Sequence, residues 1–141
     1  MARYFTEDIR FSFKNRRVYN RWIKHIASSE SKLLKDLNII FCSDDYLLDI
    51  NQKFLSHDYY TDIITFDYSE GNYISGDLFI SIDSVRDNAK HFGVDFQTEL
   101  DRVIAHGVLH LLKYDDHCDE DIKMMRAKED HYISIIKNFY E

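Results

Sequence analysis

The segment Val103–Leu112 constrains the fold most, because every residue in it is apolar or glycine except His106 and His110. A helix that is apolar nearly all round is buried, and buried polar groups need partners. Residues four apart share one helix face, so both imidazoles can point at one position, as ligands of a zinc-like ion do. The pattern predicts a buried metal-binding helix; the alternative is a pair of hydrogen-bonded core histidines.

The residues that follow this helix supply further candidate ligands, namely Asp115, Asp116 and His117. The sequence HGVLH is similar to the HExxH pattern of zinc peptidases, but Gly107 stands where that pattern has glutamate. Since that glutamate is the general base of those enzymes, the pattern argues against peptide hydrolysis by their mechanism. Gly107 also allows another element to approach the helix closely.

Hydrophobic periodicity predicts alternating helices and strands along the whole chain. Strands are expected within Met1–Phe13 and at Asp36–Cys42, Thr61–Tyr68 and Tyr73–Ile82, and the last two are expected to form a hairpin. Helices are expected at Asn15–Ser28, from Ser43 or Asp44 to Leu55, from Asp83 or Ser84 to Gly93, from Asp95 to Leu112 and at Glu120–Asn138. A polar loop is expected at Ser56–Tyr60. This order predicts one α+β domain over residues 1–141, a small mixed β-sheet packed with about five helices, one of them a zincin-like metal helix.

The charge of the chain is unevenly distributed. Lys and Arg total 18 against 25 Asp and Glu, a net charge of −7, which argues against indiscriminate binding of nucleic acid. The stretch from Arg10 to Lys24 nevertheless carries six basic residues and no acidic one. Four of them are candidate contacts to a nucleic-acid backbone: Arg16, Arg17, Arg21 and Lys24. The alternative is a solvated helix face.

Composition also points to a compartment. The longest unbroken apolar stretch, Ile39–Cys42, is far too short to span a bilayer, so no membrane association is expected. The segment from Met1 to Arg10 lacks the apolar core of a secretory signal, and two cysteines are too few for a disulfide scaffold. A reducing cytoplasm is the expected location.

Several motifs together resemble those of one known family. The sequence HGVLHLLKYDDH (His106–His117) is similar to the HGxLHLxGYDH signature of the YbeY family, single-strand-specific endoribonucleases and rRNA maturation factors. TDIITF (Thr61–Phe66) is similar to the family's TDVLSF, GDLFIS (Gly76–Ser81) to its GDIxIS, and Asn51 with Phe54 to its NxxY/F segment. The resemblance covers roughly residues 36–130.

This resemblance implies a zinc-dependent endoribonuclease that cleaves single-stranded RNA in rRNA maturation and ribosome biogenesis. One zinc ion would activate a water molecule, with His106 and Asp62 as catalytic residues. The implied partners are ribosomal RNA and the small ribosomal subunit or its proteins, in the cytoplasm.

The third metal ligand is one departure from the family pattern. The family spaces its ligands HxxxHxxxxxH, and here Asp116 occupies the last position, with His117 one residue later. Carboxylate oxygen is a competent zinc ligand, as in sites made of two histidines and one carboxylate. We expect Asp116 to be the ligand; a one-residue bulge would deliver His117 instead, and Cys118 is a third candidate. Lys113 replaces the family's glycine, so the turn itself can differ.

The other departure concerns the substrate. Leu55 stands where the family carries an arginine that its members use in RNA cleavage, and losing a guanidinium removes a bidentate phosphate clamp. Lys53 and His57 are candidate substitutes, although ordinary surface roles suit them as well. Two other hypotheses therefore stay open: a non-catalytic ribosome-assembly factor with a structural metal, and a metal-dependent hydrolase of another substrate.

Overall fold

The structure, a computed structural model, describes residues 1–55 and 61–140. The loop expected at Ser56–Tyr60, which includes His57, lies outside the described residues. In chain order the elements are β1 (Ala2–Thr6), α1 (Arg16–Ser29), β2 (Leu33–Cys42), α2 (Asp44–Leu55), β3 (Ile63–Asp67), β4 (Tyr73–Ser81), α3 (Ile82–Phe92), α4 (Phe96–Leu111), α5 (Asp119–Ile135) and the short 3-10 helix η1 (Ile136–Phe139).

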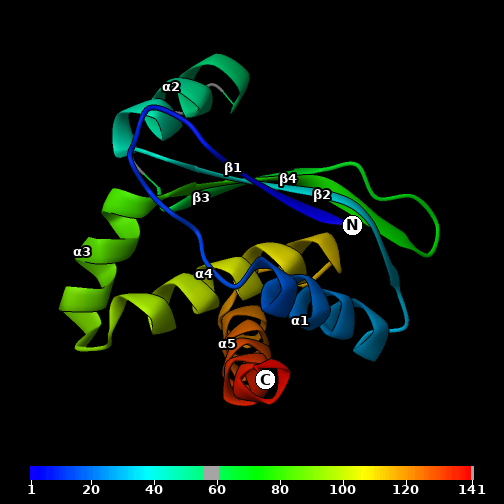
Figure 1. Cartoon of the computed structure of the whole chain (residues 1–141). Helices are drawn as coiled ribbons and strands as arrows, with labels where there is room; N and C mark the ends of the chain where they lie inside the picture. The colour runs from blue at the N-terminus through cyan, green and yellow to red at the C-terminus, as the bar shows by residue number, and fades with distance from the viewer. Residues whose placement is uncertain (56–60, 141) are drawn as a thin grey trace.

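The described strands form one mixed sheet in the order β1-β2-β4-β3. β1 and β4 pair with β2 in parallel, and β3 pairs with β4 antiparallel as the expected hairpin. Gly71 in the connecting turn has a φ of 56°, a left-handed conformation that glycine adopts without strain. The sheet and the five α-helices of the described residues confirm the α+β class (Figure 1).

Helices cover both faces of the sheet. Figure 1 shows α1, α4 and α5 on one side of it and α2 on the other. On the first side the alternate residues Ile74, Leu78 and Ile80 of β4 are buried against α1 and α4. On the other side Leu47 and Ile50 of α2 pack in a second, smaller cluster.

Gly107 lets α4 lie close to the sheet. A Cβ at this position would lie 2.8 Å from methyl carbons of both Ile63 on β3 and Leu78 on β4. The expectation that this glycine permits a close approach is therefore confirmed, and β3, one of the two edge strands, packs against the helix that carries both histidines. No helix in the described part of the chain is long and apolar enough to cross a membrane.

Helix ends agree with the sequence in most places. Asp95 caps α4 by accepting a hydrogen bond from the Thr98 N–H at 2.7 Å, and Gly93 ends α3 with a φ of 67°. The expected cap of α3 at Asp83 or Ser84 is wrong, because the Ser81 hydroxyl oxygen accepts from the Ser84 N–H and the helix begins at Ile82.

Helical periodicity predicts that Phe54 of α2 and Ile122 of α5 lie on the buried sides of their helices, but both are exposed. Phe54, at the end of α2, is 68% exposed, and Ile122, in the first turns of α5, is 48% exposed. The buried side of α5 is formed by Met125, Glu129 and Tyr132. Apolar periodicity does not count the glutamate, so it assigns the wrong side of the helix to the core at Ile122.

Candidate metal centre

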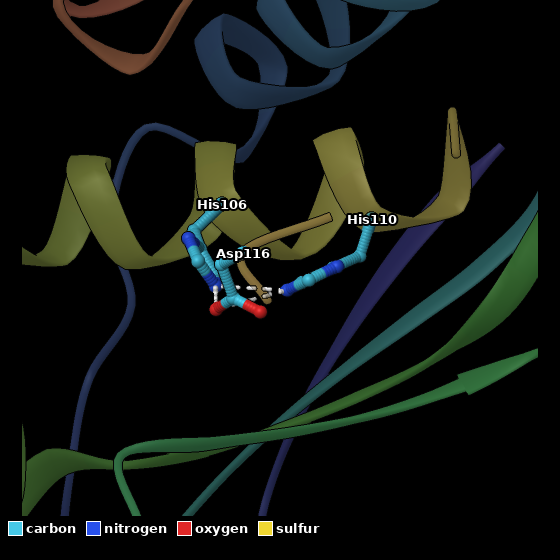
Figure 2. A group of neighbouring side chains, drawn as sticks. All are labelled: His106, His110 and Asp116. Atoms are coloured by element: carbon cyan, nitrogen blue, oxygen red, sulfur yellow. Dashed lines mark hydrogen bonds and ion pairs between the residues drawn. The ribbon is translucent and has the colours of Figure 1, made fainter. Parts of the chain in front are cut away.

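His106 and His110 lie on the same side of α4, one turn apart. Figure 2 shows both imidazoles leaving the helix toward one point, with Asp116 reaching them from the segment after the helix. The helix around them is buried by apolar residues, and the histidine side chains retain exposures of 23% and 24%. The buried residues of α4 therefore fix the positions of both histidines, while the imidazole rings remain partly accessible to solvent.

The end of α4 turns the chain back toward the histidines. Lys113 adopts a φ of 75°, and its N–H donates to the His110 carbonyl while the Tyr114 N–H donates to that of Leu109. This is the Schellman pattern, which usually uses glycine at the left-handed position. Lys113 therefore occupies a left-handed position that usually takes glycine, and its ammonium lies 2.5 Å from Asp67 at the end of β3.

The atoms of the three side chains fit a metal ion. Nε2 of His106 lies 2.9 Å from Nε2 of His110 and 3.5 Å from Oδ2 of Asp116, and the His110–Asp116 distance is 3.8 Å. A tetrahedral zinc site with bonds of about 2.0–2.1 Å separates its donor atoms by about 3.3 Å. Two imidazoles and a carboxylate are also a zinc-type donor set, so His106, His110 and Asp116 could hold one ion.

The other candidate ligands lie apart from this group. The His117 side chain is 82% exposed, and its Nε2 lies 3.9 Å from Asp115 rather than beside His106. Cys118 is exposed and precedes the first turn of α5. The turn thus favours Asp116 over His117 as third ligand.

Glu129 on α5 contacts Nδ1 of His106, the ring nitrogen that faces away from the candidate metal position. The sequence did not predict this residue as part of the site. Its Oε2 lies 2.7 Å from His106 Nδ1, and its Oε1 lies 2.9 Å from Arg102 Nη1. A carboxylate that accepts from Nδ1–H fixes the ring and leaves Nε2 for a metal. The available signal was a glutamate in register with Met125 and Tyr132 on an otherwise buried face.

The two histidines are in different electrostatic surroundings. Burial lowers the pKa of His106, but the hydrogen bond and charge of Glu129 outweigh it and the net pKa is raised. Burial and the neighbouring charge of His106 lower the pKa of His110. Burial also raises the pKa of Asp62, against the lowering effect of His106.

Two hollows flank the histidine–aspartate group, and both are lined by Asp62, Ile63, His106 and Asp116. Asp62 therefore lines the same two hollows as the candidate ligands His106 and Asp116. The first hollow, of about 350 Å³, lies against α3, α4 and α5; we call it the α5 hollow. The second, of about 510 Å³, includes Leu55 and is called the Leu55 hollow.

The basic residues of the first helix lie elsewhere. Arg16, Arg17, Arg21 and Lys24 are exposed on α1, and none of them lines either hollow. The guanidinium of Arg16 lies over the Tyr4 ring and that of Arg21 over the Phe139 ring. Lys53, proposed as a substitute for the missing arginine, pairs with Asp49 at 3.1 Å on the surface of α2.

Relatives of the chain share nearly its whole length. Proteins named Endoribonuclease YbeY from Flavobacterium johnsoniae and Azobacteroides pseudotrichonymphae are both 47% identical, over 93% and 96% of this chain and 94% and 97% of the relative. A protein of the same name from Cytophaga hutchinsonii is 50% identical over 95% of this chain and 94% of its own length.

A solved structure and a family model agree with these relatives. A solution structure of a Thermotoga maritima protein is 28% identical and superimposes with a TM-score of 0.66, covering 96% of this chain and 89% of that one. The model of the family described as Endoribonuclease YbeY matches residues 3–137. The chain is therefore a member of the YbeY family of endoribonucleases, as its motifs predict.

Proposed function

We propose that this protein is a zinc-dependent endoribonuclease that cleaves single-stranded RNA during rRNA maturation and ribosome biogenesis in the cytoplasm. The printed names of the relatives support cleavage of RNA. The donor set of two imidazoles and one carboxylate supports zinc.

The observation that carries the proposal is that the metal group has three donors and opens on two hollows. Structural zinc sites are closed by four protein ligands, whereas catalytic sites use three and keep one position open. Only His106, His110 and Asp116 form such a group among the residues that the structure describes. This arrangement favours catalysis over the structural-metal alternative.

Each residue then has a distinct task. His106, His110 and Asp116 hold the ion, and Glu129 keeps the His106 ring in the tautomer that presents Nε2. When bound, zinc lowers the pKa of a coordinated water from 15.7 to about 7 and stabilises charge on phosphate oxygens. Asp62, beside His106 in both hollows, orients the attacking water and takes its proton on a carboxylate oxygen.

The two hollows share the histidine–aspartate group, and we propose that the RNA crosses both of them as a single strand, whose unpaired bases are free to contact the protein. The basic face of α1, with Arg16, Arg17, Arg21 and Lys24, is proposed to contact more distant RNA backbone or the small ribosomal subunit.

The test is cleavage of matched single-stranded and duplex RNA by the full chain, with zinc, with chelator, and with zinc restored. We expect cleavage of the single strand only, lost with chelator and recovered with zinc. The variant with both His106→Ala and His110→Ala, purified identically, controls for contaminating nuclease and should be inactive. Cleavage that survives complete removal of metal would overturn the proposal.

Leu55 is the observation that favours the alternative, a ribosome-assembly factor without catalysis. It lies in the Leu55 hollow, 39% exposed, where the family's arginine would stand. If the zinc-loaded wild-type protein leaves single-stranded RNA intact yet binds ribosomal particles, the alternative holds.

A further inference from the structure

The α5 hollow contains arginines, whereas the described lining of the Leu55 hollow contains neither lysine nor arginine. Lysine and arginine favour RNA binding because RNA carries a charge at every nucleotide. The α5 hollow also holds four carboxylates, those of Asp62, Glu99, Asp116 and Glu129, but of the two hollows it is the one whose described lining offers a guanidinium to a phosphate.

The two arginines of this hollow are not equivalent. The Arg102 guanidinium is occupied, with Nη1 2.9 Å from Glu129 and Nη2 2.7 Å from Asp130. Arg126, on α5, is exposed and makes no ion pair with any carboxylate that the structure describes. Burial and the charge of Asp62 raise the pKa of Glu99 in the same hollow, and the charges of Arg102 and Arg126 oppose this rise, so the charge of Arg126 acts inside the hollow.

The hollow also has apolar walls beside Arg126. Phe92, at the end of α3, is 57% exposed, and Ile122, one turn before Arg126, is 48% exposed. Apolar faces next to a guanidinium suit a nucleotide, whose base needs a flat or apolar surface and whose phosphate needs a fork of N–H donors.

We propose that the α5 hollow is a nucleotide subsite in which Arg126 binds the phosphodiester next to the one that is cleaved. This inference rests on the proposed function and names the residue that holds the substrate. Arg126 contacts a phosphate that does not react, so it binds the ground state and the transition state equally. Its loss should weaken substrate binding and leave the chemical step unchanged.

The experiment is single-turnover cleavage of a labelled single-stranded RNA by the zinc-loaded full chain. Four proteins are compared: wild type, Arg126→Gln, Arg126→Lys and the matched control Lys123→Gln. Lys123 is exposed on the same helix and lines neither hollow, so its variant makes a similar charge change away from the subsite. Zinc content and thermal unfolding verify that each protein is intact.

For Arg126→Gln we expect the half-saturating protein concentration to rise about tenfold, with the maximal rate constant within about twofold of wild type. The slope of log affinity against log salt should become shallower by about 0.7, which is the loss of one phosphate contact on a single strand. Arg126→Lys should retain the wild-type slope, and Lys123→Gln should match wild type throughout.

If Arg126→Gln behaves like Lys123→Gln while the wild type cleaves RNA, this inference is wrong and the proposed function stands. A fall in the rate constant without a change in half-saturation also overturns it. If the wild type cleaves no RNA, the proposed function fails and this subsite with it.

Discussion

At the scale of single residues, Glu129 connects the candidate ligands to the rest of the fold. It is 4% exposed and divides its two oxygens between His106 and Arg102. A buried carboxylate is stable only with partners, and here the partners are the candidate ligand His106 and the Arg102 guanidinium. The position of the His106 ring thus depends on a residue of another helix.

Replacing Glu129 by Gln should weaken zinc binding about 10- to 100-fold, because the His106 ring loses its charged partner. Asp130→Asn is the matched control, since Asp130 contacts the same Arg102 but is 57% exposed and does not touch His106. Zinc affinity is measured by competition with a chromophoric chelator. Equal affinities in the two variants would show that Glu129 does not position the ligand.

Asp101 gives the fold a pH dependence through a hydrogen-bonded group that includes none of the candidate ligands. Burial raises its pKa to about 6, although hydrogen bonds from Tyr19 and Gln97 oppose the shift. Between the unfolded value of 3.8 and about 6 the folded state binds more protons, so its stability falls as pH rises.

Asp101→Asn removes this titration and keeps an acceptor for Tyr19. From pH 4 to pH 7 the free energy of unfolding should therefore fall by roughly 2 kcal/mol more in the wild type than in Asp101→Asn. Urea unfolding at both pH values measures the difference. Asp87→Asn, the same change at an exposed position of α3, should follow the wild type. Parallel behaviour of wild type and Asp101→Asn would contradict the account.

At the scale of elements, periodicity and capping residues predicted most of the architecture. Asp95 and Gly93 mark the ends of α4 and α3 because both act through local backbone geometry. The predicted start of α3 was wrong because Ser81 is both the last residue of β4 and the N-cap of α3. Its hydroxyl accepts from the Ser84 N–H and donates to Asp44. Such a double use depends on α2, which is distant in sequence.

The turn after α4 is an element-level feature with its own test. Lys113 holds a left-handed conformation, which costs a residue with a side chain roughly 1 kcal/mol relative to glycine. Lys113→Ala and Lys113→Gly both remove the ion pair with Asp67, but only glycine relieves the backbone. Lys113→Gly should therefore be more stable to urea than Lys113→Ala by about 1 kcal/mol. Equal stabilities would mean that the turn carries no strain.

At the scale of the whole molecule, the site joins α4, the following segment, α5 and the start of β3. The helical pair His106 and His110 was predictable because both lie on one element. Motif spacing favoured Asp116 over His117, but the turn closed by Lys113 that brings Asp116 to the histidines could not be predicted. Glu129 and Arg126 were missed because their contribution to the site depends on the packing of α5 on α4. The zincin-like character of α4 stays a prediction.

The central claim is that His106, His110 and Asp116 together hold one zinc ion. The most direct test is the zinc content of wild type, Asp116→Ala and His117→Ala after loading with zinc and exhaustive dialysis. The account predicts about one zinc per chain in wild type and His117→Ala and none in Asp116→Ala. Wild-type protein without zinc, or zinc retained by Asp116→Ala and lost from His117→Ala, would contradict it.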